Sequence, residues 1–69
     1  MKYYVCYEGA GYHGGIIEEY DDYSKAKEHF FRLKHSPRNT NDISVYIEET
    51  TDDQQFVDIL IEHNYAHPE

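Results

Sequence analysis

The sequence has no tryptophan, a single cysteine and only six cations, and each shortage excludes something. Because Cys6 stands alone, no disulfide can form within the chain, which is typical of proteins from a reducing compartment. No apolar run approaches the roughly 20 residues that a membrane-spanning helix needs. The opening residues, MKYYV, do not follow the basic, apolar and small-residue order of a signal peptide. We therefore expect a cytoplasmic protein that does not bind membranes.

The length of 69 residues predicts a single domain over residues 1–69. A core of this size stabilises a fold by only a few kcal/mol, so small domains often add a metal, a disulfide or a second subunit. With the internal disulfide excluded, a homodimer through an open sheet edge or a tyrosine-rich face stays open as an alternative.

Tyrosine and carboxylates are what the chain has in abundance. It contains eight tyrosines and three phenylalanines, and tyrosine suits interfaces because it combines a large apolar ring with a hydroxyl. The net charge is −8, but residues 25–38 hold a local balance of +4 and the rest of the chain −12. Such asymmetry attracts a cationic partner to one side of the molecule, although solubility alone also explains an acidic surface.

Strands are predicted where apolar and polar side chains alternate with a period of two. The segments are residues 2–8 (KYYVCYE), 16–20 (IIEEY) and 43–48 (ISVYIE). Between the first two, residues 9–15 contain four glycines, and we expect them to form a flexible turn. The first twenty residues therefore read as a β-hairpin with a long tip.

One helix is predicted over residues 23–34, YSKAKEHFFRLK. Its apolar side chains recur at i, i+3, i+7 and i+10 on one stripe: Tyr23, Ala26, Phe30 and Leu33. Asp21-Asp22 supplies acids where the helix begins, and Ser36-Pro37 ends it.

The tail can be interpreted as a helix or as a strand. The run from Thr51 to Gln54 has the spacing of a capping box, and the apolar residues after it recur at helical spacing. Against this, Val57, Ile59 and Ile61 alternate as in a strand. The cap decides for a helix over residues 52–63.

The fold class is therefore α+β, a small antiparallel sheet packed on one helix in the order β-β-α-β-α. The alternative is β-β-α-β-β, if the tail pairs with the third strand. The predicted core consists of Val5, Ile16, Ala26, Phe30, Leu33, Val45, Ile47, Phe56 and Leu60.

No catalytic set stands out. Cys6 lies in a predicted strand without a basic residue close in sequence, so nothing favours a reactive thiolate. His63 and His67 have the i, i+4 spacing of two metal ligands on a helix, but no third ligand lies nearby. The glycine-rich stretch joins two strands, whereas phosphate-binding loops lead into a helix. We expect no enzymatic activity, no catalytic residue, no metal ion and no cofactor.

Carboxylates occur in adjacent pairs at the predicted ends of strands and starts of helices. Neighbours on a strand point to opposite faces, which excludes a two-acid site at Glu18-Glu19 or Glu48-Glu49. A row of carboxylates can instead occupy a basic nucleic-acid channel through Coulombic attraction. The predicted partner-binding residues are Glu18, Glu19, Asp21, Asp22, Glu48, Glu49, Asp52, Asp53, Tyr12 and Tyr20.

The segments KYYVCYE, IIEEY, DDYSKAKEHF and ISVYIEE, over residues 1–49, resemble the organisation of small acidic proteins of phages and other mobile elements, including some anti-CRISPR proteins. That resemblance implies an inhibitor acting in the host-cell cytosol, and it carries over no functional residue. The opening strand, glycine-containing turn and second strand are also similar to antitoxins of the HicB type, whose following Pro-Gly turn this sequence lacks.

We therefore expect a non-enzymatic acidic inhibitor or modulator that occludes a basic, nucleic-acid-binding surface of a host protein complex. Direct nucleic-acid binding is disfavoured because binders of nucleic acid normally carry a basic balance. The alternatives are an antitoxin-like module that neutralises a basic toxin, and an accessory subunit whose acidity serves solubility.

Overall fold

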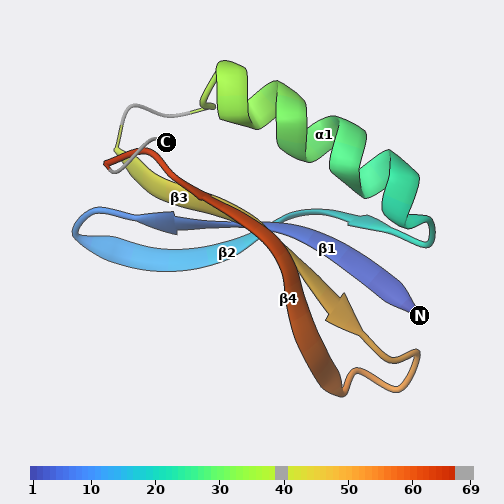
Figure 1. Ribbon diagram of the computed structural model, residues 1–69. Helices are drawn as coiled ribbons and strands as arrows, with labels where there is room; N and C mark the ends of the chain where they lie inside the picture. Colours follow the sequence, from blue (N-terminus) through green and yellow to red (C-terminus); the bar gives the residue numbers. More distant parts are fainter. Residues whose placement is uncertain (39–40, 67–69) are drawn as a thin grey trace.

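Four strands and one helix make up the described part of the chain (Figure 1). The structure is a computed structural model that describes residues 1–38 and 41–66, with only the backbone of Tyr12. The elements are β1 (Lys2–Gly9), β2 (Tyr12–Tyr20), α1 (Tyr23–His35), β3 (Asp42–Thr50) and β4 (Phe56–Asn64). All neighbouring strands are antiparallel, in the sheet order β2-β1-β3-β4. The α+β class is confirmed, and the order is β-β-α-β-β, the alternative predicted from the sequence.

The β1–β2 hairpin has a much shorter turn than the sequence suggests. Only Ala10 and Gly11 separate the two strands, and Gly11 adopts a φ of 79° that side chains other than glycine rarely reach. At Gly14, a Cβ atom would lie 2.3 Å from the carbonyl oxygen of Tyr7, so only glycine lets β2 approach β1 there. The expected flexible turn over residues 9–15 was therefore wrong: the turn is limited to Ala10 and Gly11, and Gly14 serves the close pairing of the two strands.

The helix begins and ends where the sequence places its boundaries. The carboxylate of Asp22 accepts a hydrogen bond from the N–H of Ser24 (2.8 Å), which satisfies a backbone donor of the first turn. At the other end, the N–H of Ser36 donates to the carbonyl of Arg32 (2.9 Å), and Pro37 follows. The basic side chains of the last turn lie where the helix dipole favours positive charge.

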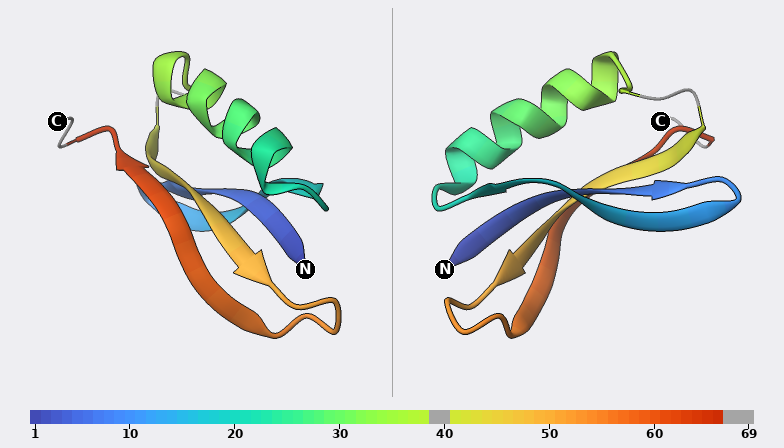
Figure 2. Two further views of the ribbon diagram at one scale, coloured as in Figure 1. Left: turned by 45° about the vertical axis from the view of Figure 1, so that its right-hand side comes forward. Right: turned by 180° about the vertical axis from the view of Figure 1, so that it is seen from behind.

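Helix α1 lies across one face of the sheet, over β1, β2 and β3 (Figures 1 and 2). The buried core between the two layers consists of Val5, Ala26, Phe30, Leu33, Val45 and Ile47. All six were predicted. Of the other three predicted core residues, Leu60 is only half-buried, whereas Ile16 and Phe56 are 58% and 60% exposed. The turn between β3 and β4 lies far from the helix, at the opposite side of the molecule (Figure 2).

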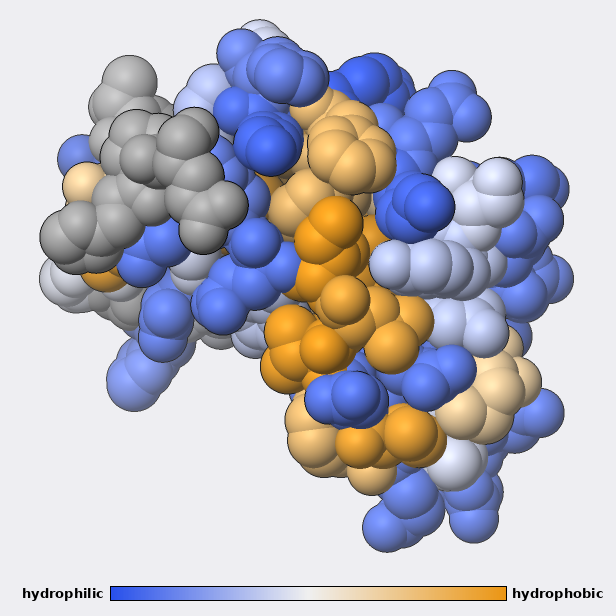
Figure 3. Space-filling view, in the orientation of Figure 1, coloured by the Kyte–Doolittle hydropathy of each residue, from blue (hydrophilic) through white to orange (hydrophobic). Residues whose placement is uncertain are grey.

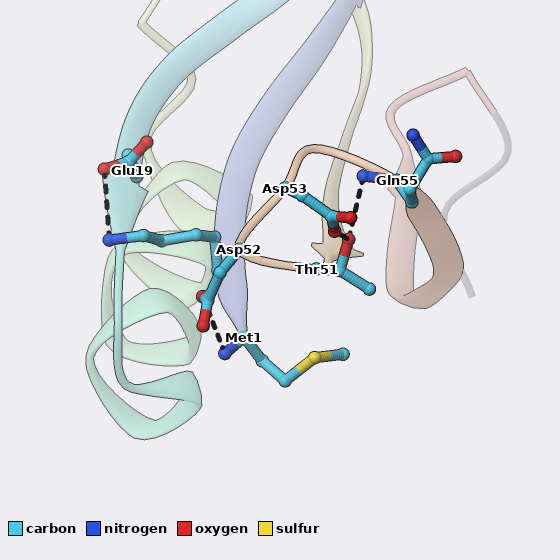
Figure 4. Close-up of polar contacts among 7 residues, drawn as sticks. Met1, Glu19, Thr51, Asp52, Asp53 and Gln55 are labelled. Atoms are coloured by element: carbon cyan, nitrogen blue, oxygen red, sulfur yellow. Dashed lines mark hydrogen bonds and ion pairs between the residues drawn. The ribbon is translucent and has the colours of Figure 1, made fainter.

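The predicted helix over residues 52–63 was wrong, because β4 occupies most of that segment. Thr51 does make the kind of bond a helix cap makes: its hydroxyl oxygen accepts the N–H of Gln55 at 2.9 Å (Figure 4). That bond closes the turn into β4, aided by Gln54 at a φ of 67°. Pairing along the whole of β3 then favours the strand over the local helical pattern.

The hydroxyl of Tyr65 ties the end of β4 to the end of α1, because it donates to the carbonyl oxygen of Leu33 at 2.6 Å. Replacing Tyr65 by phenylalanine keeps the ring, which lies edge-on to His63 with centroids 5.0 Å apart. We expect the free energy of unfolding to fall by about 0.5–1.5 kcal/mol, the usual net value of one hydrogen bond. Urea denaturation of both proteins measures this change, and an unchanged midpoint would show that the bond contributes nothing.

Candidate partner-binding surface

The face of the sheet opposite α1 is not covered by any described element. Residues paired directly across antiparallel strands share a face, so the registers assign each side chain to the helix side or to this open face. Val5, Val45 and Ile47 fix the helix side, because they pack in the core with α1. The open face comprises Lys2, Tyr4, Cys6, Glu8, Ile16, Glu19, Ser44, Tyr46, Glu48, Thr50, Phe56, Ile59, Glu62 and Asn64.

Carboxylates on the open face stand beside tyrosine rings. Tyr4 pairs with Glu19 on one side and with Glu48 on the other, which places the three side chains in one row across the sheet. Burial and the neighbouring Glu19 carboxylate raise the pKa of Tyr4. Burial, Cys6 and the carboxylates of Glu48 and Glu8 likewise raise the pKa of Tyr46. Both hydroxyls therefore stay protonated at neutral pH and can donate hydrogen bonds.

Three of these carboxylates form no ion pair among the described residues. Lys2 approaches Glu19 with its Nζ 3.7 Å from Oε2. For Glu8, Glu48 and Glu62, no ion pair forms with any residue in the described ranges. Their charge is therefore directed at solvent, or at a cationic partner.

Positive charge gathers on the other side of the molecule. Lys25, Lys27, Arg32 and Lys34 are exposed on α1. Lys27 lies over the ring of Tyr23 and Lys34 over that of Phe31, at 5.3 and 5.9 Å from the centroids. The exposed cations of α1 thus lie on the side of the sheet away from Glu8, Glu48 and Glu62, although Glu18, Glu49 and the acids at the start of α1 share the helix side with them.

Two small hollows flank Glu48 on the open face. The first, of about 240 Å³, is lined by Glu8, Tyr46, Glu48, Ile59 and Glu62. The second, of about 200 Å³, is lined by Tyr4, Ile16, Glu48, Thr50, Gln54 and Phe56. Both are smaller than the roughly 300–1,000 Å³ of ordinary small-molecule sites, so each is of a size to receive a single side chain.

The predicted partner-binding carboxylates lie at one end of the sheet but face different ways. The β1 register brings the ends of β2 and β3 together on either side of Tyr3 and Tyr4. Glu19 and Glu48 belong to the open face, whereas their neighbours Glu18 and Glu49 pair with helix-side residues. Adjacent acids therefore do point to opposite faces, as predicted.

The other predicted partner-binding residues are dispersed or already engaged. Asp22 caps α1, and Asp52 binds the amino-terminal nitrogen of Met1 at 3.0 Å (Figure 4). That ammonium, through a hydrogen bond and its charge, lowers the pKa of Asp52. The hydroxyl of Tyr20 lies 2.9 Å from Nδ1 of His29, so its polar end points to α1. Asp21 and Asp53 are exposed, and the side chain of Tyr12 lies outside the described residues.

Sequence reasoning missed Glu8, Glu62, Tyr46, Ile59 and Phe56 as members of this surface. Phe56, Ile59 and Glu62 could not be assigned to it because the segment that forms β4 was expected to be a helix. The alternation of Val57, Ile59 and Ile61 was the available signal, since it indicates a strand. Glu8 and Tyr46 follow from the alternation of β1 and β3 once the core face is known.

Apolar side chains extend from α1 onto β4 as a continuous band on the molecular surface (Figure 3). The exposed apolar residues of these two elements include Phe31 on the helix and Phe56, Val57 and Ile59 on the strand. The main contacts of α1 are with the other three strands, so β4 retains no fully buried residue. Exposed apolar area of this kind is common where proteins bind one another.

The reactive groups nearest to this surface are a thiol and several carboxylates. Cys6 is 2% exposed, and burial raises the pKa of its thiol to about 11. Within the described ranges, no three potential ligands gather to hold a metal ion; His67 lies outside them. A third hollow, of about 800 Å³, is lined by residues between 28 and 36, so among the described residues it is the open flank of one helix.

No family model, curated protein or solved structure matches the chain. None of the helical residues described forms a segment long and apolar enough to cross a bilayer. The site must therefore be interpreted from its own geometry.

Proposed function

We propose that this protein is a non-enzymatic binding protein that occludes a basic surface of a partner protein with its open face. One observation carries the proposal: carboxylates and tyrosines lie side by side on the uncovered face of the sheet. Among the described residues, Glu8, Glu48 and Glu62 form no ion pair. The neighbouring Tyr4 and Tyr46 are half-buried. A rigid sheet presents these groups with little loss of conformational entropy, which favours tight association.

The charge distribution supports a basic partner. The open face and the adjoining strand ends are acidic, and the exposed cations of α1 lie on the opposite side. A field of this kind accelerates encounters with a basic surface and orients them. The resemblance to mobile-element inhibitors makes a nucleic-acid-binding surface of a host complex the expected target.

The proposal predicts a partner whose complex weakens with salt. The protein, immobilised, should capture a nucleic-acid-binding protein from a host lysate, and raising the salt from about 50 to about 500 mM should release it. Reconstituted with the purified partner, the chain should displace nucleic acid. Capture of a small basic toxin would replace this proposal with the antitoxin alternative, and a salt-insensitive complex would contradict both.

Two double variants with the same change in net charge distinguish a direct contact on the open face from a general effect of charge. Glu19→Lys with Glu48→Lys alters the open face, whereas Glu18→Lys with Glu49→Lys alters the adjacent helix-side positions. We expect the first pair to weaken the complex roughly tenfold or more, and the second pair to weaken it less, through the long-range field alone. Equal effects, measured by calorimetry, would argue against the open face as the contact surface.

A further inference from the structure

Glu48 forms a wall common to both hollows of the open face. Its carboxylate therefore reaches a cation placed in either one. The remaining walls differ, but each includes a tyrosine and an exposed aliphatic or aromatic side chain: Tyr46 and Ile59 in one hollow, Tyr4, Ile16 and Phe56 in the other.

These walls match the composition of a long basic side chain. Arginine and lysine place an apolar stem against apolar surface and keep the charged end at a polar group. A tyrosine ring attracts the cation through its face, and the carboxylate forms a charge-assisted hydrogen bond with it. Glu8 and Glu62 add further negative charge to the hollow that contains Tyr46.

The spacing of the hollows matches an extended chain. One hollow spans the β3 positions from Tyr46 to Glu48, and the next spans those from Glu48 to Thr50. Along β3 the two hollows therefore follow one another, and side chains on one face of a strand recur every two residues, or about 7 Å. In an extended segment, residues i and i+2 point to the same side with this separation.

We propose that the two hollows are subsites for two basic side chains at positions i and i+2 of an extended segment of the partner protein. This inference rests on the proposed function and names the chemistry that the partner must present. The segment lies across the open face and is recognised through its side chains.

Addition of a strand to the edge of β4 is disfavoured by the edge itself. The N–H of Ile59 donates to the carboxylate of Asp58 at 2.8 Å, and pairing with β3 shifts register at two places. Such irregularities blunt an edge strand against further pairing.

A second copy of this chain lacks the required segment. Among the described strands, only Lys2 is basic, so no strand presents cations at i and i+2. Two pairs have that spacing, Lys25 with Lys27 and Arg32 with Lys34, but both lie on a helix, where residues i and i+2 point in different directions. A heterologous basic partner is therefore the occupant that the charges fit.

Two isomeric peptides of equal charge test the spacing. The first is acetyl-Ser-Thr-Arg-Val-Arg-Thr-Ser-amide, and the second moves the valine so that the two arginines are adjacent. Adjacent residues of an extended chain point to opposite sides, so we expect the second peptide to bind about tenfold more weakly by calorimetry at low salt. Equal affinities, or no measurable binding of either peptide, would overturn the inference.

A matched pair of variants tests the subsites. Glu48→Gln should weaken the first peptide about tenfold and abolish its advantage over the second. Glu28→Gln removes the same charge from an exposed position on α1 and should change the affinity less than twofold, since exposed charges at a distance are screened. Amide spectra of both variants check that the fold is retained, and equal losses in the two would overturn the subsites.

Failure here is distinguishable from failure of the proposed function. If the captured partner binds with the predicted salt and variant dependence while the peptides do not discriminate, the subsites are wrong and the function stands. If the peptides discriminate but no basic partner is captured, the proposed occlusion is what fails.

Discussion

Replacing Phe30 by alanine should leave the protein largely unfolded at room temperature. The ring is 1% exposed and packs at the centre of the core between α1 and the sheet. Such truncations cost about 3–5 kcal/mol, because apolar contacts are lost and a cavity remains. A single small core supplies little more than about 3–5 kcal/mol in total, so the loss approaches the whole stability. Circular dichroism during urea titration measures it.

The neighbouring residue offers a control of the same type. Phe31 is 39% exposed and touches Phe30 edge-to-face, with ring centroids 5.3 Å apart. Phe31→Ala should cost about 1 kcal/mol, the value of one aromatic pair with little burial, and the variant should remain folded. If both variants lost the same stability, the core would not lie where the structure places it.

This contrast was predictable from the sequence, because helical spacing alone places Phe30 on the apolar stripe and Phe31 off it. The helix, three strands and six of the nine predicted core residues follow from such local periodicity. Local patterns suffice for these elements because the apolar residues of each recur with one period, and the face they form is the face that the fold buries.

A bulge accounts for the core error at Ile16. Pairing of β1 with β2 shifts between Val5 and Cys6, so that Ile17 packs on the core and Ile16 faces the open side. A one-residue shift exchanges the faces of a strand, and alternation in one strand cannot reveal where its partner shifts. Phe56 was expected in the core because the tail was predicted to be a helix, whereas in β4 it pairs with Thr50 of the open face, which no described element covers.

The tail shows the limit of local reasoning more generally. Residues 52–63 satisfy both a helical cap and a strand alternation, and only the unpaired edge of β3 decides between them. That edge is created by residues far away in sequence. The prediction of the candidate site was incomplete for the same reason. The acidic strand ends were predictable, but Glu48 and Glu62 share a face only because β4 is a strand.

The thiol of Cys6 should be almost unreactive in the folded protein. It is 2% exposed, and burial together with the nearby Glu48 carboxylate raises its pKa from 9.0 to about 11. At pH 8 this shift alone lowers the thiolate fraction about a hundredfold, and the thiolate is the nucleophile. Alkylation by iodoacetamide, followed by mass spectrometry, should therefore be at least about a hundredfold slower than in urea. Comparable rates would show that Cys6 is accessible.

The same shift makes alkaline pH destabilising. Below pH 9 the thiol is protonated whether the chain is folded or not, so it contributes no pH dependence. Between pH 9 and about 11 the unfolded chain releases the proton while the folded one retains it, which favours unfolding. A shift of two pH units corresponds to about 2–3 kcal/mol lost over this range.

Urea titrations at pH 8 and at pH 10.5 measure that loss, and Cys6→Ala isolates the contribution of the thiol. The variant should begin less stable but lose less as the pH rises. Some dependence should remain in it, because burial also raises the pKa of Tyr3, Tyr4, Tyr46 and Tyr65. An identical slope in both proteins would mean that Cys6 does not ionise differently in the folded and unfolded chain, and hence that the open face leaves it in contact with water.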